Sequence, residues 1–135
     1  MKKSVILPEG HPVFGSNKVF DLFQYNPAVE SNGLLFIAGQ IGMCADGTIP
    51  EEVSEQCDLA FQRLGAILEA RGLSFDDLVE LTTYHVDIDS HLTSFREVKE
   101  RYIKKDFPAW TILGVSALAR PILKIEIKAV AAMKK

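Results

Sequence analysis

The chain has 135 residues, of which 47% are hydrophobic and 24% are charged, and its net charge is −3. This balance predicts one globular domain over residues 1–135, and it argues against a nucleic-acid partner, because phosphate contacts need clustered Lys and Arg. Two cysteines are too few for a secreted disulfide framework, and no apolar run reaches the length of a membrane span. We therefore expect a cytoplasmic protein that makes no membrane contact.

A hairpin is the first element that the sequence predicts. Asn32-Gly33 separates residues 28–31 from residues 34–38, and this dipeptide is typical of a type I′ turn, in which both central residues have positive φ. The second arm is apolar on both faces, which indicates that both faces are covered. A long helix is then expected from Pro50-Glu51 to about Gly72, because its apolar residues recur every three or four positions.

The second half of the chain predicts a strand, a helix and two further strands. The strand over residues 79–88 is rich in β-branched and aromatic residues, and Ser90 is the expected cap of a helix that Pro108 stops. Residues 109–118 and 122–131 are expected to form a closing hairpin. Residues 124–129 alternate between charged and apolar side chains, which is the period of a strand with one buried face.

These elements predict an α+β domain with a single β-sheet and two helices packed on one face of it. Two helices cover only one face of the sheet. The other face would still carry apolar residues from 34–38 and 110–118. Because an open apolar face of that size is unusual on a monomer, we expect the chain to self-associate.

Several motifs in one register give the chain a family resemblance. Gly39-Gln40-Ile41-Gly42, after an apolar strand, resembles the strand end of the Rid (YjgF) family of reactive-intermediate deaminases. The similarity runs from about Tyr25 to Ala132. Its other motifs are Ala66-Ile67-Leu68-Glu69-Ala70, Phe75-Asp76-Asp77-Leu78-Val79, Phe107-Pro108-Ala109 and Lys124-Ile125-Glu126-Ile127.

The resemblance implies a YjgF-like, chorismate-mutase-like fold with a mixed sheet, and a homotrimer around a central β-barrel with small-molecule clefts between its subunits. Active members of the family hydrolyse 2-imino or enamine acids to 2-oxo acids and ammonia, without a cofactor or a metal. The site has only to hold the substrate, position a water molecule and move protons.

The family's site residues are only partly present. Tyr25 and Gly39 match residues that line the cleft, and Glu126 matches the carboxylate that acts on the hydrolytic water. Trp110, followed by Thr111, stands where the family has a carboxylate-binding arginine. Ile112 replaces a cysteine of the cleft. At the position of the second helix where the family has an asparagine, this chain has Arg96, a possible relocated cation.

The loss of the arginine matters most, because a guanidinium binds a carboxylate bidentately whereas Trp110 offers one neutral N–H group. It argues against standard 2-imino acid deamination. Each matched residue also has a structural interpretation. Trp110 could belong to the core, Glu126 could form a cross-strand ion pair, Tyr25 could anchor a loop, and Arg96 could be a solvated surface residue.

Three functions follow from these alternatives. The first is an enzyme that hydrolyses an imine, an enamine or a related carbonyl compound, with Glu126 as its acid–base group. The second is a non-catalytic module that binds a small metabolite in the same clefts. The third, a ribonuclease or translation inhibitor, is the least supported, because the chain lacks an interleaved basic and aromatic surface.

Overall fold

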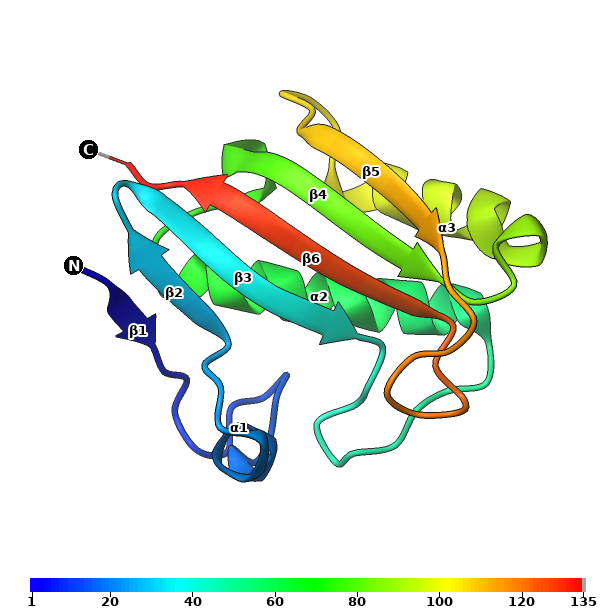
Figure 1. Cartoon of the computed structure of the whole chain (residues 1–135), viewed down its shortest axis with the longest axis horizontal. Helices are drawn as coiled ribbons and strands as arrows, with labels where there is room; N and C mark the ends of the chain where they lie inside the picture. The colour runs from blue at the N-terminus through cyan, green and yellow to red at the C-terminus, as the bar shows by residue number, and fades with distance from the viewer. Residues whose placement is uncertain (135) are drawn as a thin grey trace.

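A computed structural model describes residues 1–134. Its centre is one six-stranded sheet with the strand order β1-β2-β3-β6-β4-β5 (Figure 1). The strands are β1 Lys3–Val5, β2 Ala28–Ser31, β3 Leu34–Ile41, β4 Leu78–His85, β5 Ala109–Gly114 and β6 Ile125–Ala132. The helices are α1 Lys18–Phe23, α2 Val53–Ala70, α3 Ile88–Tyr102 and the 3-10 helix η1 Phe75–Asp77.

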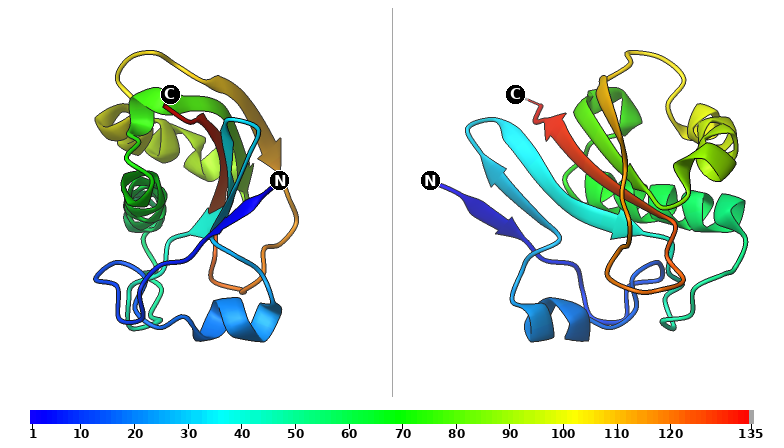
Figure 2. Two further views of the ribbon diagram at one scale, coloured as in Figure 1. Left: turned by 90° about the vertical axis from the view of Figure 1, so that its left-hand side faces the viewer. Right: turned by 45° about the vertical axis from the view of Figure 1, so that its right-hand side comes forward.

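The two long helices, α2 and α3, lie on the same face of the sheet (Figure 2). The core fills the space between these two layers, and its largest fully buried side chains include Phe61, Leu64, Phe95, Ile125 and Ile127. The expected α+β architecture, a mixed sheet with two helices on one face, is therefore confirmed. Within residues 1–134, no helix is both long and apolar enough to cross a membrane.

The other face of the sheet carries no long helix. Phe36 of β3 is 47% exposed there, and Leu113 of β5 is 42% exposed. The expected uncovered apolar face is therefore present in the single chain, although Trp110, which was expected on it, belongs to the opposite face.

The hairpin at Asn32-Gly33 is confirmed. Asn32 has φ 51° and Gly33 has φ 77°, so both central residues are in the left-handed region that a type I′ turn requires. β3 continues beyond residue 38 to Ile41, and its pairing with β6 shifts between Ile37 and Gln40. Two residues, Ala38 and Gly39, stand there opposite one residue of β6, which is the pattern of a β-bulge.

The expected closing hairpin is wrong. β6 lies in the middle of the sheet and pairs antiparallel with β3 and β4, whereas β5 is an edge strand that pairs in parallel with β4. The parallel pair is joined through α3, as parallel strands require a long crossover. Alternation in residues 124–129 identifies a strand with one buried face, but it does not identify the neighbours of that strand.

Several expected boundaries also shift. Ser90 lies inside α3, and the residue that caps this helix is Asp87, which has φ 54°. β5 ends at Gly114, and residues 115–124 form the loop that leads to β6. β1, α1 and η1 were not predicted from the sequence. None of the residues of α1 is buried, so the apolar periodicity that identifies a helix is absent.

Gln56 of α2 holds the loop that precedes β6. Its buried amide donates hydrogen bonds to the carbonyls of Pro50 (2.9 Å) and Ile122 (3.0 Å) and accepts one from the N–H of Lys124 (2.9 Å). The amide thereby ties two loops to one helix, while the carbonyl of Lys124 accepts a backbone hydrogen bond from Val86 (2.8 Å).

Replacing Gln56 with leucine should therefore lower the free energy of unfolding by about 2–4 kcal/mol, because the three backbone groups lose their partner at a buried position. Urea denaturation measures this effect. The exposed Gln62 on the same helix is the control, and its replacement by leucine should change stability by no more than about 0.5 kcal/mol. Equal losses in the two variants would show that the Gln56 amide is not a tether.

Candidate functional site

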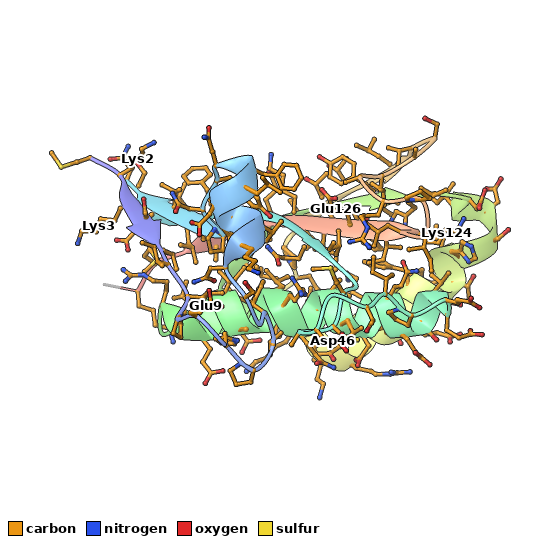
Figure 3. The ribbon with its side chains drawn as sticks, turned by 90° about the horizontal axis from the view of Figure 1, so that it is seen from below. Lys2, Lys3, Glu9, Asp46, Lys124 and Glu126 are labelled. Atoms are coloured by element: carbon orange, nitrogen blue, oxygen red, sulfur yellow. The ribbon has the colours of Figure 1, made fainter. Side chains whose placement is uncertain are left out.

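Glu126 lies on β6 with its side chain on the sheet face opposite the long helices. Its neighbours in the register are Ile41 of β3 and Tyr84 of β4. Figure 3 shows Glu126 on the side of the sheet away from α2. Its position follows from the alternation of β6, because Ile125 and Ile127 on either side of it are fully buried under the helices.

The backbone of Gly39 lies directly against the Glu126 carboxylate. A Cβ atom at residue 39 would overlap Oε2 of Glu126, so any larger residue would push the carboxylate out of its present position. Gly39 belongs to the bulge of β3, which the Gln40 side chain spans by donating to the carbonyl of Ala38 (2.9 Å). The bulge thus places the backbone of Gly39, which has no side chain, next to the carboxylate of Glu126.

Tyr25 is the third residue of this group. The ring packs edge-on against Phe20 of α1, with 5.1 Å between centroids. Burial raises the pKa of the Tyr25 hydroxyl; the nearby Arg63 opposes this rise, and Glu126 adds to it. The structure therefore places Gly39 in contact with Glu126 and Tyr25 within electrostatic reach of the same carboxylate, although the three residues come from a loop and two different strands.

The Glu126 carboxylate has no hydrogen-bond donor or cation within bonding distance among residues 1–134. Its pKa is raised above the ordinary glutamate value by burial. The cross-strand ion pair is absent, because Lys124 bonds instead to Asp87 (3.1 Å). A half-buried carboxylate without a partner is typical of a group that handles protons or a ligand.

Trp110 lies on the other face of the sheet. Its indole N–H donates to the hydroxyl of Thr83 (2.9 Å), and that hydroxyl also lies 2.7 Å from Nε2 of His85. Its ring packs 6.0 Å from that of Phe95 in α3. The expectation that Trp110 belongs to the uncovered apolar face is therefore wrong, because it packs on the helix side. Its only N–H group is already bonded.

Lys99 of α3 is a residue that the sequence reasoning missed. Its ammonium lies 4.6 Å from the centroid of the Trp110 indole and 5.9 Å from that of Phe107. Burial lowers its pKa, which the nearby Glu100 opposes. Helical spacing was the available signal, since Lys99 follows the buried Phe95 by one turn. Arg96, the cation that was expected here, is exposed and has no ion pair among residues 1–134.

The remaining expected residues divide between the two faces. Thr111 stands opposite Thr82 on the same face as Glu126. Ile112 shares the helix-side register of Trp110 and is 39% exposed at the sheet edge. One chain therefore does not gather all the expected residues around a single pocket. Tyr84, the β4 neighbour of Glu126, was not expected from the sequence.

The main cavities of the chain also lie elsewhere. The largest, about 1020 Å³, lies between the segment 6–13 and α2. A cavity of about 330 Å³ reaches Tyr25, but Glu126, Gly39 and Trp110 line none of the five principal cavities within residues 1–134. Those residues also contain no group of three or more His, Cys, Asp or Glu side chains arranged to hold a metal ion.

A family model, curated relatives and solved structures each match most of this chain. The family model described as Endoribonuclease L-PSP matches residues 17–133. The RutC family protein YjgH of Escherichia coli is 33% identical over 97% of this chain and 95% of that protein. The human 2-iminobutanoate/2-iminopropanoate deaminase is 35% identical over 79% and 78% of the two chains. A solved structure of YjgH has a TM-score of 0.85 at 30% identity and covers 99% of this chain and 98% of its own.

Proposed function

Because the chain belongs to the Endoribonuclease L-PSP, or Rid/YjgF, family, we propose that it binds a small compound with a C=N or C=O bond in clefts between the subunits of a homotrimer. Glu126 acts there as the acid–base group of a hydrolysis. The human relative is named a 2-iminobutanoate/2-iminopropanoate deaminase, which supports C=N hydrolysis as the reaction type.

The observation that carries this proposal is the unpaired Glu126 carboxylate. Its raised pKa brings it closer to neutral pH, so it can take a proton from water and return one to the departing nitrogen. The missing side chain of Gly39 leaves room for the carboxylate itself, and the Tyr25 hydroxyl, whose pKa Glu126 helps to raise, supplies a further polar group for the cleft. An imine carbon is already electrophilic, so positioning and proton transfer are enough.

A second subunit is needed because Glu126 lines no cavity of the single chain. The face around it exposes Phe36 and Leu113, which a neighbouring copy would cover while leaving a cleft at the carboxylate. Light scattering should therefore give three times the mass of the chain. A monomer at assay concentration would contradict the shared cleft.

The proposed substrate is a neutral imine or carbonyl compound rather than a compact 2-imino acid. The position after Phe107-Pro108-Ala109 is Trp110, and its indole N–H already bonds to Thr83. This side chain therefore offers no pair of donors for a carboxylate. Two assays test this proposal: 2-imino acids generated in place by an amino-acid oxidase, and a neutral aromatic imine. We expect faster hydrolysis only of the neutral imine.

The human deaminase is the positive control for the imino acids. Imino acid hydrolysis at a rate comparable with that protein would overturn the substrate assignment. No acceleration of either compound, with saturable binding of the neutral one, would instead identify the non-catalytic binding module.

The pKa of Glu126 can be checked directly. Burial favours the protonated form in the folded chain, so this residue contributes stability that is fully present below the unfolded pKa and is lost as pH rises through the folded pKa. An NMR titration of the carboxyl carbon should give a midpoint above that of a free glutamate. A midpoint at or below the ordinary value would mean that the carboxylate is solvated or paired.

A further inference from the structure

Arg63 of α2 is a buried cation outside the site described above. Arg63 is only 5% exposed. Nε donates to the carbonyl of Met43 (2.8 Å), one terminal nitrogen lies 3.5 Å from the carbonyl of Cys44, and the guanidinium stacks 4.7 Å from the centroid of Phe14. No carboxylate within residues 1–134 pairs with it. Two carbonyl groups satisfy part of its hydrogen bonding but do not neutralise its charge.

A cavity of about 190 Å³ opens on this guanidinium. Its walls are mainly apolar, and Lys18 adds a second cation. The apolar lining residues are Phe14, Val19, Phe20 and Met43. Asp46 is the one acidic residue of the lining, but its carboxylate accepts hydrogen bonds from the N–H (3.0 Å) and the hydroxyl (2.7 Å) of Thr48. Two cations thus meet an apolar space that contains no free anion.

We propose that this cavity binds a small organic monocarboxylate with a short apolar chain. The carboxylate pairs with the unbonded edge of the Arg63 guanidinium and with Lys18, and the chain lies against Phe20 and Met43. The physical reason is the cost of a buried charge, which is large unless the charge is paired. The volume lies below the 300–1,000 Å³ usual for ligand pockets, which restricts the ligand to a few carbons.

This site is separate from Glu126. Neither Glu126 nor Gly39 lines the cavity, and in Figure 3 Asp46, which does, lies toward the helix side of the sheet, whereas Glu126 lies toward the opposite side. The two sites are linked through Tyr25, whose pKa both Arg63 and Glu126 influence, and through the aromatic contacts of Phe14 with Phe20 and of Phe20 with Tyr25. The proposal therefore stands whether or not the chain is an enzyme.

Titration of the full chain with butanoate, followed by NMR, tests the proposal against chloride at equal ionic strength. We expect saturable shifts in the Arg63 Nε–H signal and in the amides of residues 43–47, with a Kd of about 1–10 mM. Shifts that chloride reproduces would overturn the proposal. Inorganic phosphate that binds as tightly as butanoate would refute the assignment to a monocarboxylate.

Three variants and a control locate the binding. Lys18→Ala should weaken butanoate binding about two- to fivefold, as expected for a solvated charge at the rim. Arg63→Met should weaken it at least about tenfold, because a charged hydrogen bond is lost. Val19→Phe fills the cavity from the exposed helix α1 without touching Arg63, so it abolishes binding even if Arg63→Met does not fold. The control is Lys104→Ala, at an exposed lysine just after the end of α3, and it should change nothing. Unaltered binding in Val19→Phe and Lys18→Ala would place the ligand elsewhere.

Discussion

Replacing Glu126 by glutamine should reduce kcat for the neutral imine by about 10²–10⁴-fold, the usual contribution of a general acid–base group. Glutamine has the same shape and keeps its contact with the Gly39 backbone, but it can neither accept nor release the proton. Substrate binding should be nearly unchanged, because the group acts on the water and on the departing nitrogen. Steady-state kinetics separate kcat from KM.

The matched control is Glu80→Gln. Glu80 of β4 lies opposite Val130 of β6, on the same uncovered face as Glu126. It is exposed, and it is not a neighbour of Glu126 in the register. Turnover in this variant should equal that of the unchanged chain. If Glu126→Gln kept full activity, the carboxylate would not be the acid–base group, and the mechanism proposed for this cleft would be wrong.

Replacing Trp110 by alanine should lower the free energy of unfolding by about 3 kcal/mol, at the lower end of the range for large aromatic residues because Trp110 is partly exposed. The variant loses the packing of the indole on Phe95 and the hydrogen bond to Thr83. It also removes the surface on which the Lys99 ammonium stacks. Urea denaturation measures the loss.

Trp110→Phe separates the two contributions. It keeps most of the apolar contact and removes only the N–H, so we expect it to recover more than half of the lost stability, since a neutral hydrogen bond contributes about 1 kcal/mol. A loss below about 1 kcal/mol in Trp110→Ala would show that the indole does not pack as described. The structural role of Trp110 would then give way to a ligand-binding one.

The sequence predicted the layers of the fold because each layer has a local periodic signal. α2 has an apolar stripe, β6 alternates, and the Asn32-Gly33 turn accepts positive φ at both positions. Strand partners have no such local signal. The position of β6 between β3 and β4 depends on how elements distant in the sequence meet, which is why the closing hairpin was expected in error.

The candidate site divides in the same way. The group of Tyr25, Gly39 and Glu126 was predicted from the family motifs; in the structure Gly39 contacts Glu126, and Glu126 influences the pKa of Tyr25. Lys99 and Arg63 were missed, because a lysine or an arginine on a helix usually lies in solvent. Only the packing of α3 against β5 and of α2 against the loop 43–47 gives these cations their surroundings.

The β-bulge of β3 determines which residue of this strand stands opposite Glu126. Beyond the bulge, Ile41 pairs with Glu126. If the same residues paired regularly from Ile37 onward, Gln40 would stand opposite Glu126 instead, an amide would lie beside the carboxylate, and residue 39 would turn towards the helices. A single deletion at Ala38, in contrast, would remove the extra residue and keep Ile41 opposite Glu126, so the cleft would lose the bulge without a change of register.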